Sequence, residues 1–416
     1  MITRIIGISL IIFLGISSGQ NFTTEKYLTL EDAISIGLKN SPQLKSSTGR
    51  INLTNAKFWS GISLPSPELT LSYEYVPNGY NLNHYGERNL GVSQSFEFPS
   101  NYFLRGSILY RQEEIAKEEF NLSQLEVILK IKSAYFTVLA KQELLKNGKD
   151  NLSLAQDFAD KAAIRYDVGE GTNLEKLTAK VQFSEALNTV ELLKNQVESA
   201  LSELICAMGL GNGNEDEYAL TDRLEFKSLS VSLGELYNET VDVNPNIKIN
   251  KLSLTNSTIQ KTLAWSSLLP NFNIGYYRQS LDGINKYYGA SFGISIPVWF
   301  LFDQRGKIEE AAANVSIAEA ELQLKVDAHY LKLKKAFIEL KNSESQIHLY
   351  EDDLLPQTEE IFRSAGKSYD AGEINYIEYL QAKQTVINSK NNYINALLTY
   401  NLSFISLEDA VGKRIK

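Results

Sequence analysis

The pentapeptide Tyr166-Asp-Val-Gly-Glu170 recurs as Tyr369-Asp-Ala-Gly-Glu373, at a spacing of 203 residues. Other segments repeat at nearly the same spacing and in the same order. Residues 30–42 match residues 233–245, Trp59 and Pro65 match Trp265 and Pro270, and Arg105-Gly106 matches Arg305-Gly306. One match would be a coincidence, but the ordered set indicates an internal duplication. We therefore predict two repeats, residues 20–228 and 229–416, within one structural domain.

Long helices are predicted on the N-terminal side of both pentapeptides. From Arg105 to Tyr166 there is no proline, and apolar residues recur every seven positions, which is typical of a coiled-coil seam. These residues are Ile108, Ile115, Leu122, Leu129 and Phe136. The second repeat continues the pattern with Ile308, Val315 and Leu322 and then weakens at His329 and Ala336. At about 1.5 Å per residue, each helix would be a rod of roughly 90 Å.

Glycines in the two pentapeptides break these helices. A second helix is expected in each repeat, from about Asn173 to Met208 and from the second pentapeptide to about Val411. Each repeat would thus form an antiparallel helical hairpin. The spacing between repeats changes from 200 to 203 along the rod, so we expect a kink, with local overwinding, near Leu355-Pro356.

Two short segments in each repeat alternate apolar and polar residues, which predicts strands with one apolar face. The apolar positions are Leu69, Leu71, Tyr73, Tyr75, Leu90, Val92, Phe96 and Phe98, and then Phe272, Ile274, Tyr276, Tyr288, Ala290, Phe292, Ile294 and Ile296. Such strands suit either a half-buried sheet of a soluble domain or the wall of a transmembrane barrel. Four strands cannot close a barrel, so the second interpretation requires several chains to share one.

Composition excludes several classes of function. The net charge of -9 argues against a nucleic-acid partner, and 43% apolar with 22% charged residues argues against a bundle of transmembrane helices. Residues 1–19 are predicted to be a cleaved signal peptide, with a membrane anchor as the alternative. No catalytic motif is found, His84, His329 and His348 are too scattered for a metal site, and no cofactor is expected. Cys206 is expected to pack among its apolar neighbours, and residues 209–214 to form a helix stop rather than a phosphate loop.

The duplicated segments together resemble the TolC-like outer-membrane factor family. The resemblance rests on residues 30–42, on residues 296–306 (IPVWFLFDQRG) and on residues 369–382 (YDAGEINYIEYLQA). It implies a mainly α fold with a small β part. The long antiparallel helical hairpins would form a periplasmic tunnel, and four strands per chain would contribute to a shared 12-stranded barrel of a homotrimer in the outer membrane. It also implies a periplasmic adaptor and an inner-membrane pump, of the RND or the ABC class, as partners.

Within that family, residues 96–99 (FEFP) and 302–306 (FDQRG) look most like the branch that exports heavy metals with RND pumps. Channels for drug or type I protein export remain alternatives. A coiled-coil scaffold without a pore is the alternative from another class. An enzyme is not expected.

The hairpin ends are the predicted functional site, because a duct needs a seal and a contact surface for its adaptor. The residues are Tyr166, Asp167, Gly169, Glu170, Glu175, Tyr369, Asp370, Gly372, Glu373 and Glu378. Around a threefold axis each acidic residue would form a ring of three charges that favours cations. The alternative is that the acidic residues cap helix N-termini.

An arginine and two aspartates on the second hairpin end help to close the entrance in the best-known family pattern. The corresponding residues here are Ile374, Glu378 and Gln381. Only one ionic group is kept, so we expect hydrophobic or hydrogen-bonded contacts, including Tyr369, to hold this end. A partner's hairpins would then drive its opening.

Overall fold

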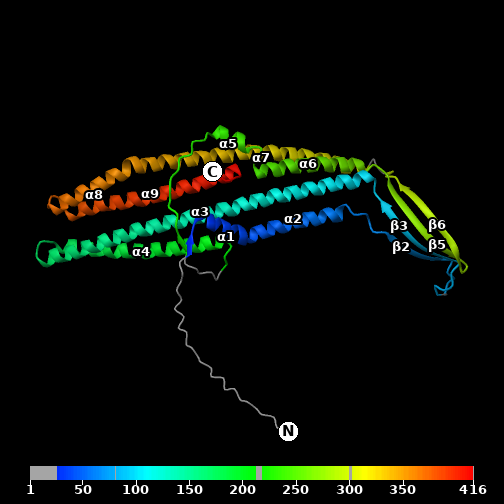
Figure 1. The fold of residues 1–416 in the computed structure, drawn as a ribbon, viewed down its shortest axis with the longest axis horizontal. Helices are drawn as coiled ribbons and strands as arrows, with labels where there is room; N and C mark the ends of the chain where they lie inside the picture. Colours follow the sequence, from blue (N-terminus) through cyan, green and yellow to red (C-terminus); the bar gives the residue numbers. More distant parts are fainter. Residues whose placement is uncertain (1–25, 80, 212–217, 299–301, 416) are drawn as a thin grey trace, which may run out of the picture.

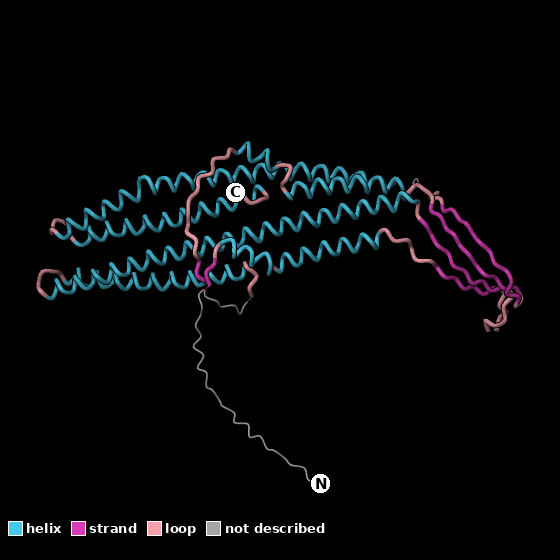
Figure 2. The backbone as a smooth tube through the Cα atoms, in the orientation of Figure 1, coloured by secondary structure: helices cyan, strands magenta, loops and turns pink. Residues whose placement is uncertain are grey.

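The computed structural model describes residues 26–79, 81–211, 218–298 and 302–415. Long helices run side by side, and a sheet continues them at one end (Figures 1 and 2). The predicted signal peptide, residues 1–19, lies outside the described residues, as do residues 299–301 of one family motif.

The two repeats contain the same elements in the same order, which confirms the predicted duplication. The first repeat comprises β1 (Lys26–Leu28), α1 (Leu30–Asn40), α2 (Pro42–Gly61), β2 (Glu68–Glu74), β3 (Glu87–Phe96), α3 (Pro99–Asp167) and α4 (Asn173–Ala207). β4 (Tyr218–Leu220) follows, and then α5 (Leu233–Thr240), α6 (Pro245–Ser266), β5 (Asn271–Leu281), β6 (Ile284–Ser295), α7 (Asp303–His348), a π-helix η1 (Leu349–Leu354), α8 (Leu355–Asp370) and α9 (Tyr376–Val411).

The long rod of the first repeat is a single helix, α3, of 69 residues. At about 1.5 Å per residue it is roughly 100 Å long. Ile108 and Leu129 of the predicted seam are buried, and the other three positions are half-buried. In the second repeat, the prediction that the seam weakens at His329 and Ala336 is wrong. These two side chains are the buried ones of the seven-residue repeat on α7, whereas Ile308, Val315 and Leu322 are half-buried. The reason is α5, which packs on α7 and covers His329 with the ring of Tyr237, 6.0 Å between ring centroids.

The irregularity near Leu355-Pro356 lies where the change of spacing predicts it, but its form differs. Residues 349–354 are π-helical, and α8 begins at Leu355 with Pro356 in its first turn. A π-helix has more residues per turn than an α-helix, so the rod is locally underwound and the predicted overwinding is wrong. The ribbon changes direction where α8 begins (Figure 1).

The four predicted strands form one antiparallel sheet in the order β2-β3-β5-β6. Phe96 pairs with Phe272, which pairs with Ile294, so the apolar positions of neighbouring strands lie on one face. Small polar residues such as Ser93, Gly275 and Ser291 line the other face. Three predicted strand positions lie just beyond the strands. Tyr75 follows the end of β2 at Glu74 and has a φ of +54°, Phe98 precedes Pro99 at the start of α3, and Ile296 follows the end of β6 at Ser295.

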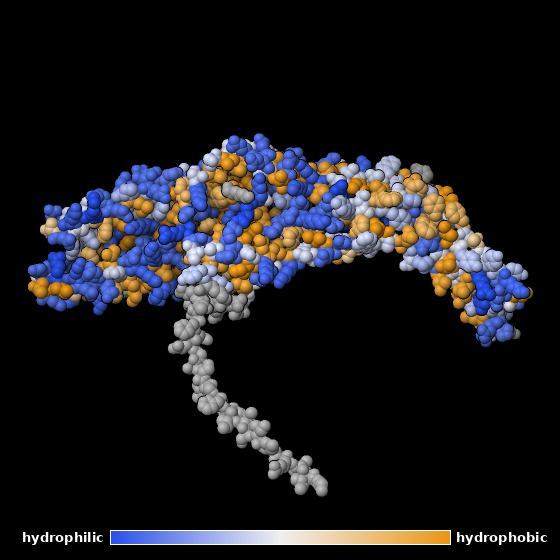
Figure 3. Space-filling model, in the orientation of Figure 1, coloured by the Kyte–Doolittle hydropathy of each residue, from blue (hydrophilic) through white to orange (hydrophobic). Residues whose placement is uncertain are grey.

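The apolar face of the sheet is uncovered. Several of its large side chains are half or more exposed: Leu69, Leu71, Ile274, Tyr276, Tyr288, Phe292 and Ile294. Figure 3 shows hydrophobic residues where the helices meet the sheet and along the sheet. The end of the sheet that points away from the helices is hydrophilic. Within the described residues β2 and β6 each have only one strand neighbour, so both edges are open.

Among the described residues, two large apolar cores lie near the middle of the rods, one in each repeat, and a smaller cluster of Leu125, Leu129 and Ile405 joins the two repeats. The first contains Tyr135, Ile131 and Leu204, and the second contains Leu333, Leu340 and Leu407. A segment without regular structure, residues 221–232, crosses from β4 to α5 over the helices (Figure 1). The predicted repeat boundary at residues 228 and 229 lies inside this segment and stays a prediction. Cys206 is exposed on α4, so the prediction that it packs among its apolar neighbours is wrong.

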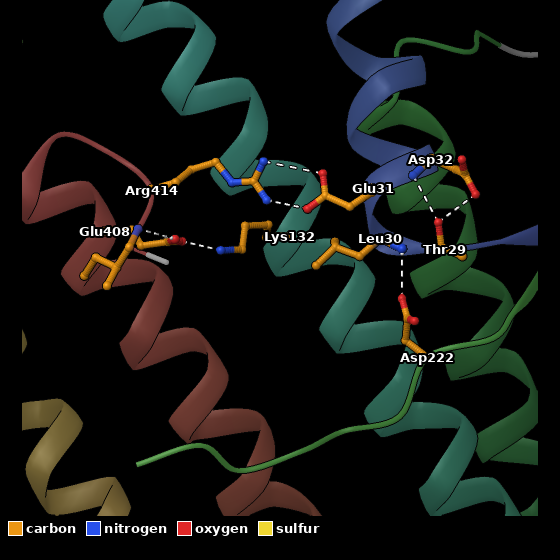
Figure 4. A network of polar contacts seen from close by, with 9 residues as sticks. Thr29, Leu30, Glu31, Asp32, Lys132, Asp222, Glu408 and Arg414 are labelled. Atoms are coloured by element: carbon orange, nitrogen blue, oxygen red, sulfur yellow. Dashed lines mark hydrogen bonds and ion pairs between the residues drawn. The ribbon is translucent and has the colours of Figure 1, made fainter. Parts of the chain in front are cut away.

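Polar contacts join the repeats beside these cores (Figure 4). The Lys132 ammonium on α3 and the Glu408 carboxylate on α9 form a buried ion pair. The backbone N–H of Ile415 donates to the same carboxylate at 3.0 Å, and Arg414 pairs with Glu31 of α1. β1 and β4 add a short parallel pair that the sequence analysis missed, and Asp222 beyond β4 accepts a hydrogen bond from the N–H of Leu30 at 2.9 Å.

Candidate functional site: the two hairpin ends

The predicted site residues lie at the two hairpin ends, which we call tip 1 (residues 166–175) and tip 2 (residues 369–378). The two tips share one backbone geometry. Gly169 has a φ of +79° and Gly372 a φ of +76°, which is the left-handed region where a side chain would be strained. In tip 1 the chain turns from α3 into α4, and in tip 2 from α8 into α9.

Two of the six acidic residues cap helices. The side chain of Glu175 accepts a hydrogen bond from the N–H of Thr172 at 3.1 Å, while the Thr172 hydroxyl accepts from the N–H of Glu175. Glu378 and Asn375 form the same capping box at the start of α9. These carboxylates therefore satisfy backbone donors of the helix termini, which is the alternative role considered for them.

The other acidic residues lie in or beside the turns. Asp167 pairs with Lys176 at 3.1 Å, and Glu373 accepts a hydrogen bond from the Ser368 hydroxyl at 3.0 Å. The side chains of Glu170 and Asp370 are exposed. Four of the six predicted acidic side chains of the tips therefore have a hydrogen-bond or ion-pair partner within their own hairpin.

The two tyrosines of the pentapeptides have different surroundings. Tyr166 is 41% exposed and lies under the ammonium of Lys176, 4.6 Å from the ring centroid, so it contacts its own hairpin. Tyr369 is half-buried and contacts the other hairpin. The Arg165 guanidinium of α3 donates a hydrogen bond to the Tyr369 hydroxyl at 3.0 Å.

An aromatic cluster surrounds Tyr369 and joins the hairpins. Phe158 of α3 lies at its centre, with ring centroids 5.9 Å from Tyr369, 5.5 Å from Tyr376 and 4.7 Å from Tyr379. Phe362 of α8 also contacts Tyr379. Aromatic pairs at such distances contribute about 0.5–1.5 kcal/mol each beyond their buried area.

Burial raises the pKa of Tyr376 to about 12, and it also raises the pKa of Tyr379. Both phenols are therefore neutral at physiological pH. The Tyr376 hydroxyl is buried and has no hydrogen-bond partner among the residues that the structure describes.

The sequence analysis missed Phe158, Arg165, Tyr376 and Tyr379. Tyr376 and Tyr379 lie within the family motif of residues 369–382 and could have been selected as part of it. Phe158 and Arg165 lie in the first repeat, so only the packing of α3 against α9 brings them to the second tip.

The arrangement offers packing and hydrogen bonds rather than reactive groups. Among the described residues, no group of three or more His, Cys, Asp or Glu side chains is placed to hold a metal ion. In the same part of the chain, no helix is long and apolar enough to cross a membrane.

The sequence matches the profile of a family described as "Outer membrane efflux protein" twice, over residues 33–210 and 236–413. The two matches are 203 residues apart, the spacing of the duplicated pentapeptides. The chain belongs to the outer membrane efflux protein family. As such it is an outer-membrane efflux channel of the TolC type and not an enzyme.

Two curated relatives of this outer membrane efflux protein span most of its length. It is 20% identical over 377 residues to the cobalt-zinc-cadmium resistance protein CzcC of Cupriavidus metallidurans, covering 89% of this chain and 86% of the relative. It is 23% identical over 440 residues to the outer membrane protein TolC of Escherichia coli, covering 98% of this chain and 85% of the relative.

Solved structures share the fold. The Campylobacter jejuni CmeC outer membrane channel aligns with a TM-score of 0.77 at 17% identity, over 92% of this chain and 85% of that one. CusC aligns with a TM-score of 0.77 at 15% identity, over 92% of both chains. These similarities confirm the predicted fold class, mainly helical hairpins with a small four-stranded sheet.

Proposed function

We propose that three copies of this efflux protein form the exit duct of a tripartite system. The uncovered apolar face of the four-stranded sheet carries the proposal. On this face Leu69, Tyr288 and Phe292 are 75%, 77% and 66% exposed. Contact of so many large apolar side chains with water is unfavourable, whereas contact with lipid is favourable. A sheet in lipid cannot leave its edges unpaired, so β2 of one copy would pair with β6 of the next and close a 12-stranded barrel.

The outer helices support the same assembly. α7 exposes an apolar residue every seven positions: Ile317, Leu324, Leu331 and Ile338. At the other edge of the helical layer, α2 exposes Leu53, and α4 exposes Leu187 and Leu192. Placed side by side in a ring, these two edges would cover each other and complete a helical tunnel.

For the cargo we propose heavy-metal cations, delivered by an RND pump through a periplasmic adaptor. The similarity to a cobalt-zinc-cadmium resistance protein supports this choice, as do residues 96–99 and 302–306. The chain is also similar to TolC, so export of drugs, or of proteins with an ABC pump, is the alternative.

The tips would form the entrance and the adaptor contact. The contacts of Arg165 and Phe158 with Tyr369 hold the two hairpins of one copy together, and an adaptor that binds better to separated hairpins would shift the tips open. The exposed side chains of Glu170 and Asp370 are the acidic groups best placed to line such an entrance.

A paired substitution tests the assembly. Leu324→Glu with Leu331→Glu would place charges at the helix interface, and we expect the heat-resistant trimer of outer-membrane fractions to disappear on gels. Lys325→Glu, an exposed position beside the stripe, is the control and should leave the trimer intact. Survival of the trimer in the double variant would refute this interface.

Growth of a strain that lacks the gene tests the cargo. We expect sensitivity to cobalt, zinc and cadmium, restored by the wild-type gene, and unchanged tolerance of lipophilic drugs. Drug sensitivity with normal metal tolerance would favour the alternative instead.

A further inference from the structure

Lys383 on α9 is buried without a partner. Only 6% of its surface is exposed, and its burial lowers the pKa of its ammonium. Within the described residues its side chain makes no hydrogen bond and has no carboxylate oxygen within 4.0 Å. A charge removed from water without compensation is costly, so this position needs an explanation.

Two other lysines on the helices between the hairpins are paired. Lys132, which is as deeply buried, contacts Glu408. Lys390, two turns further along α9, lies 3.5 Å from Glu359 of α8 and is partly exposed. Lys383 therefore differs from its neighbours in having a buried stem and an uncompensated charge.

Lys383 lines a cavity of about 290 Å³ between the two hairpins. α3 contributes Asn147, Asp150 and Asn151, α8 contributes Glu359, and α9 contributes Lys383 and Lys390. One water occupies about 30 Å³ in the liquid, so the cavity has room for a small ion together with water.

The donors in the cavity favour an anion. The Asn147 amide is fixed by a hydrogen bond to the Asn391 side chain at 2.7 Å, and the Asn151 amide makes no side-chain hydrogen bond with the described residues. Glu359 is engaged by Lys390. Asp150 is exposed and lies beyond ion-pair distance of Lys383, so it does not neutralise the ammonium.

We propose that this cavity binds a small monovalent anion between the ammonium of Lys383 and the side-chain amide of Asn151. Water could satisfy the hydrogen bonds of the ammonium, but only an anion offsets its charge. Lys383 and Asn151 come from different hairpins, so the anion stabilises the contact between them. The site is independent of the cargo and of the tip assignment.

Thermal unfolding of the purified full-length protein tests the site, with chloride exchanged for gluconate at constant ionic strength and pH. We expect chloride to raise the melting temperature of the wild type to a plateau, as binding to the folded state requires. Acetate should act similarly, because it carries the same charge on a small group. In Lys383→Met the apparent affinity for chloride should fall at least tenfold, and the melting temperature in gluconate should rise because no charge is buried.

Lys149→Met is the matched control, because it removes an exposed lysine that is next to Asp150 on α3 but does not line the cavity; its chloride response should equal that of the wild type. Line broadening of the ³⁵Cl NMR signal by the wild type, displaced by bromide, gives a readout that needs no variant. The same chloride response in wild type and Lys383→Met, or no saturable response in the wild type, would overturn the proposal.

Discussion

The guanidinium of Arg165 donates a hydrogen bond to the hydroxyl of Tyr369 at 3.0 Å, across 204 residues of sequence. Arg165 lies in the last turn of α3 in the first repeat, and Tyr369 lies in the last turn of α8 in the second. This contact ties tip 1 to tip 2 within one chain.

Tyr369→Phe is expected to loosen the tips, because it removes the hydroxyl and keeps the ring among Phe158, Tyr376 and Tyr379. A hydrogen bond at such an exposed site is worth about 1 kcal/mol, so single-channel conductance in planar bilayers should rise modestly. Tyr369→Ala, which also removes the ring contacts, should raise it further. Tyr166→Phe is the control, since Tyr166 contacts only its own hairpin among the aromatic and cation–π partners described. Equal conductance of all four proteins would contradict the tip assignment.

Tyr376→Phe is expected to stabilise the protein by about 1 kcal/mol, because the buried Tyr376 hydroxyl has no partner. Tyr135→Phe provides the opposite case. The Tyr135 hydroxyl donates to the Leu28 carbonyl at 2.9 Å or to Asp222 at 2.8 Å, so its loss should cost about 1–3 kcal/mol. Denaturant unfolding of both variants shows whether each change raises or lowers the free energy of unfolding. Destabilisation by Tyr376→Phe would mean that its hydroxyl is bonded.

Lys132→Met is expected to destabilise the protein by about 3–5 kcal/mol, because it leaves the Glu408 carboxylate buried and unpaired. Adding Glu408→Gln removes that charge, and the double variant should recover a large part of the loss. The melting temperatures of the wild type, the two single variants and the double variant show how strongly the effects of the two substitutions depend on each other. Additive losses would show that the two groups do not interact.

Stability should fall on mild acidification because of His329. Its burial, and to a lesser degree Lys332, lower its pKa below the usual 6.5. Tyr237 stacks on the ring, and Thr240 and Asn244 contact its nitrogens at 3.3 and 3.4 Å. The unfolded chain therefore binds a proton more readily than the folded one.

The contribution of His329 is complete above about pH 6.5 and is lost as the pH falls towards the lowered pKa, by at most about 1.4 kcal/mol per pH unit. His329→Gln should flatten this part of the melting-temperature profile. A profile that keeps its slope in His329→Gln would assign the effect to other groups.

The sequence alone determined the elements of this fold. Heptad spacing along residues 108–136 fixed α3, because an apolar row every seven residues can be buried only on a helix. Alternation in residues 69–75 and 288–296 predicted the strands and their apolar face, since side chains of a strand alternate between its two faces. The duplicated pentapeptides located both tips, because glycines there adopt the left-handed conformation.

Contacts between distant segments were decided only by the tertiary structure. Phe158 and Arg165 contact Tyr369 because α3 packs along α9, which pairs with α8, and no local pattern encodes that packing. The π-helical form of residues 349–354 was likewise not predictable, since a change of spacing shows where the two rods differ in length but not how the backbone absorbs it. Lys132 on α3 pairs with Glu408, whereas Lys383 on α9 has no carboxylate oxygen within ion-pair distance among the described residues. Burial and charge pairing depend on which helix lies opposite, and the packing of the two repeats against each other determines that.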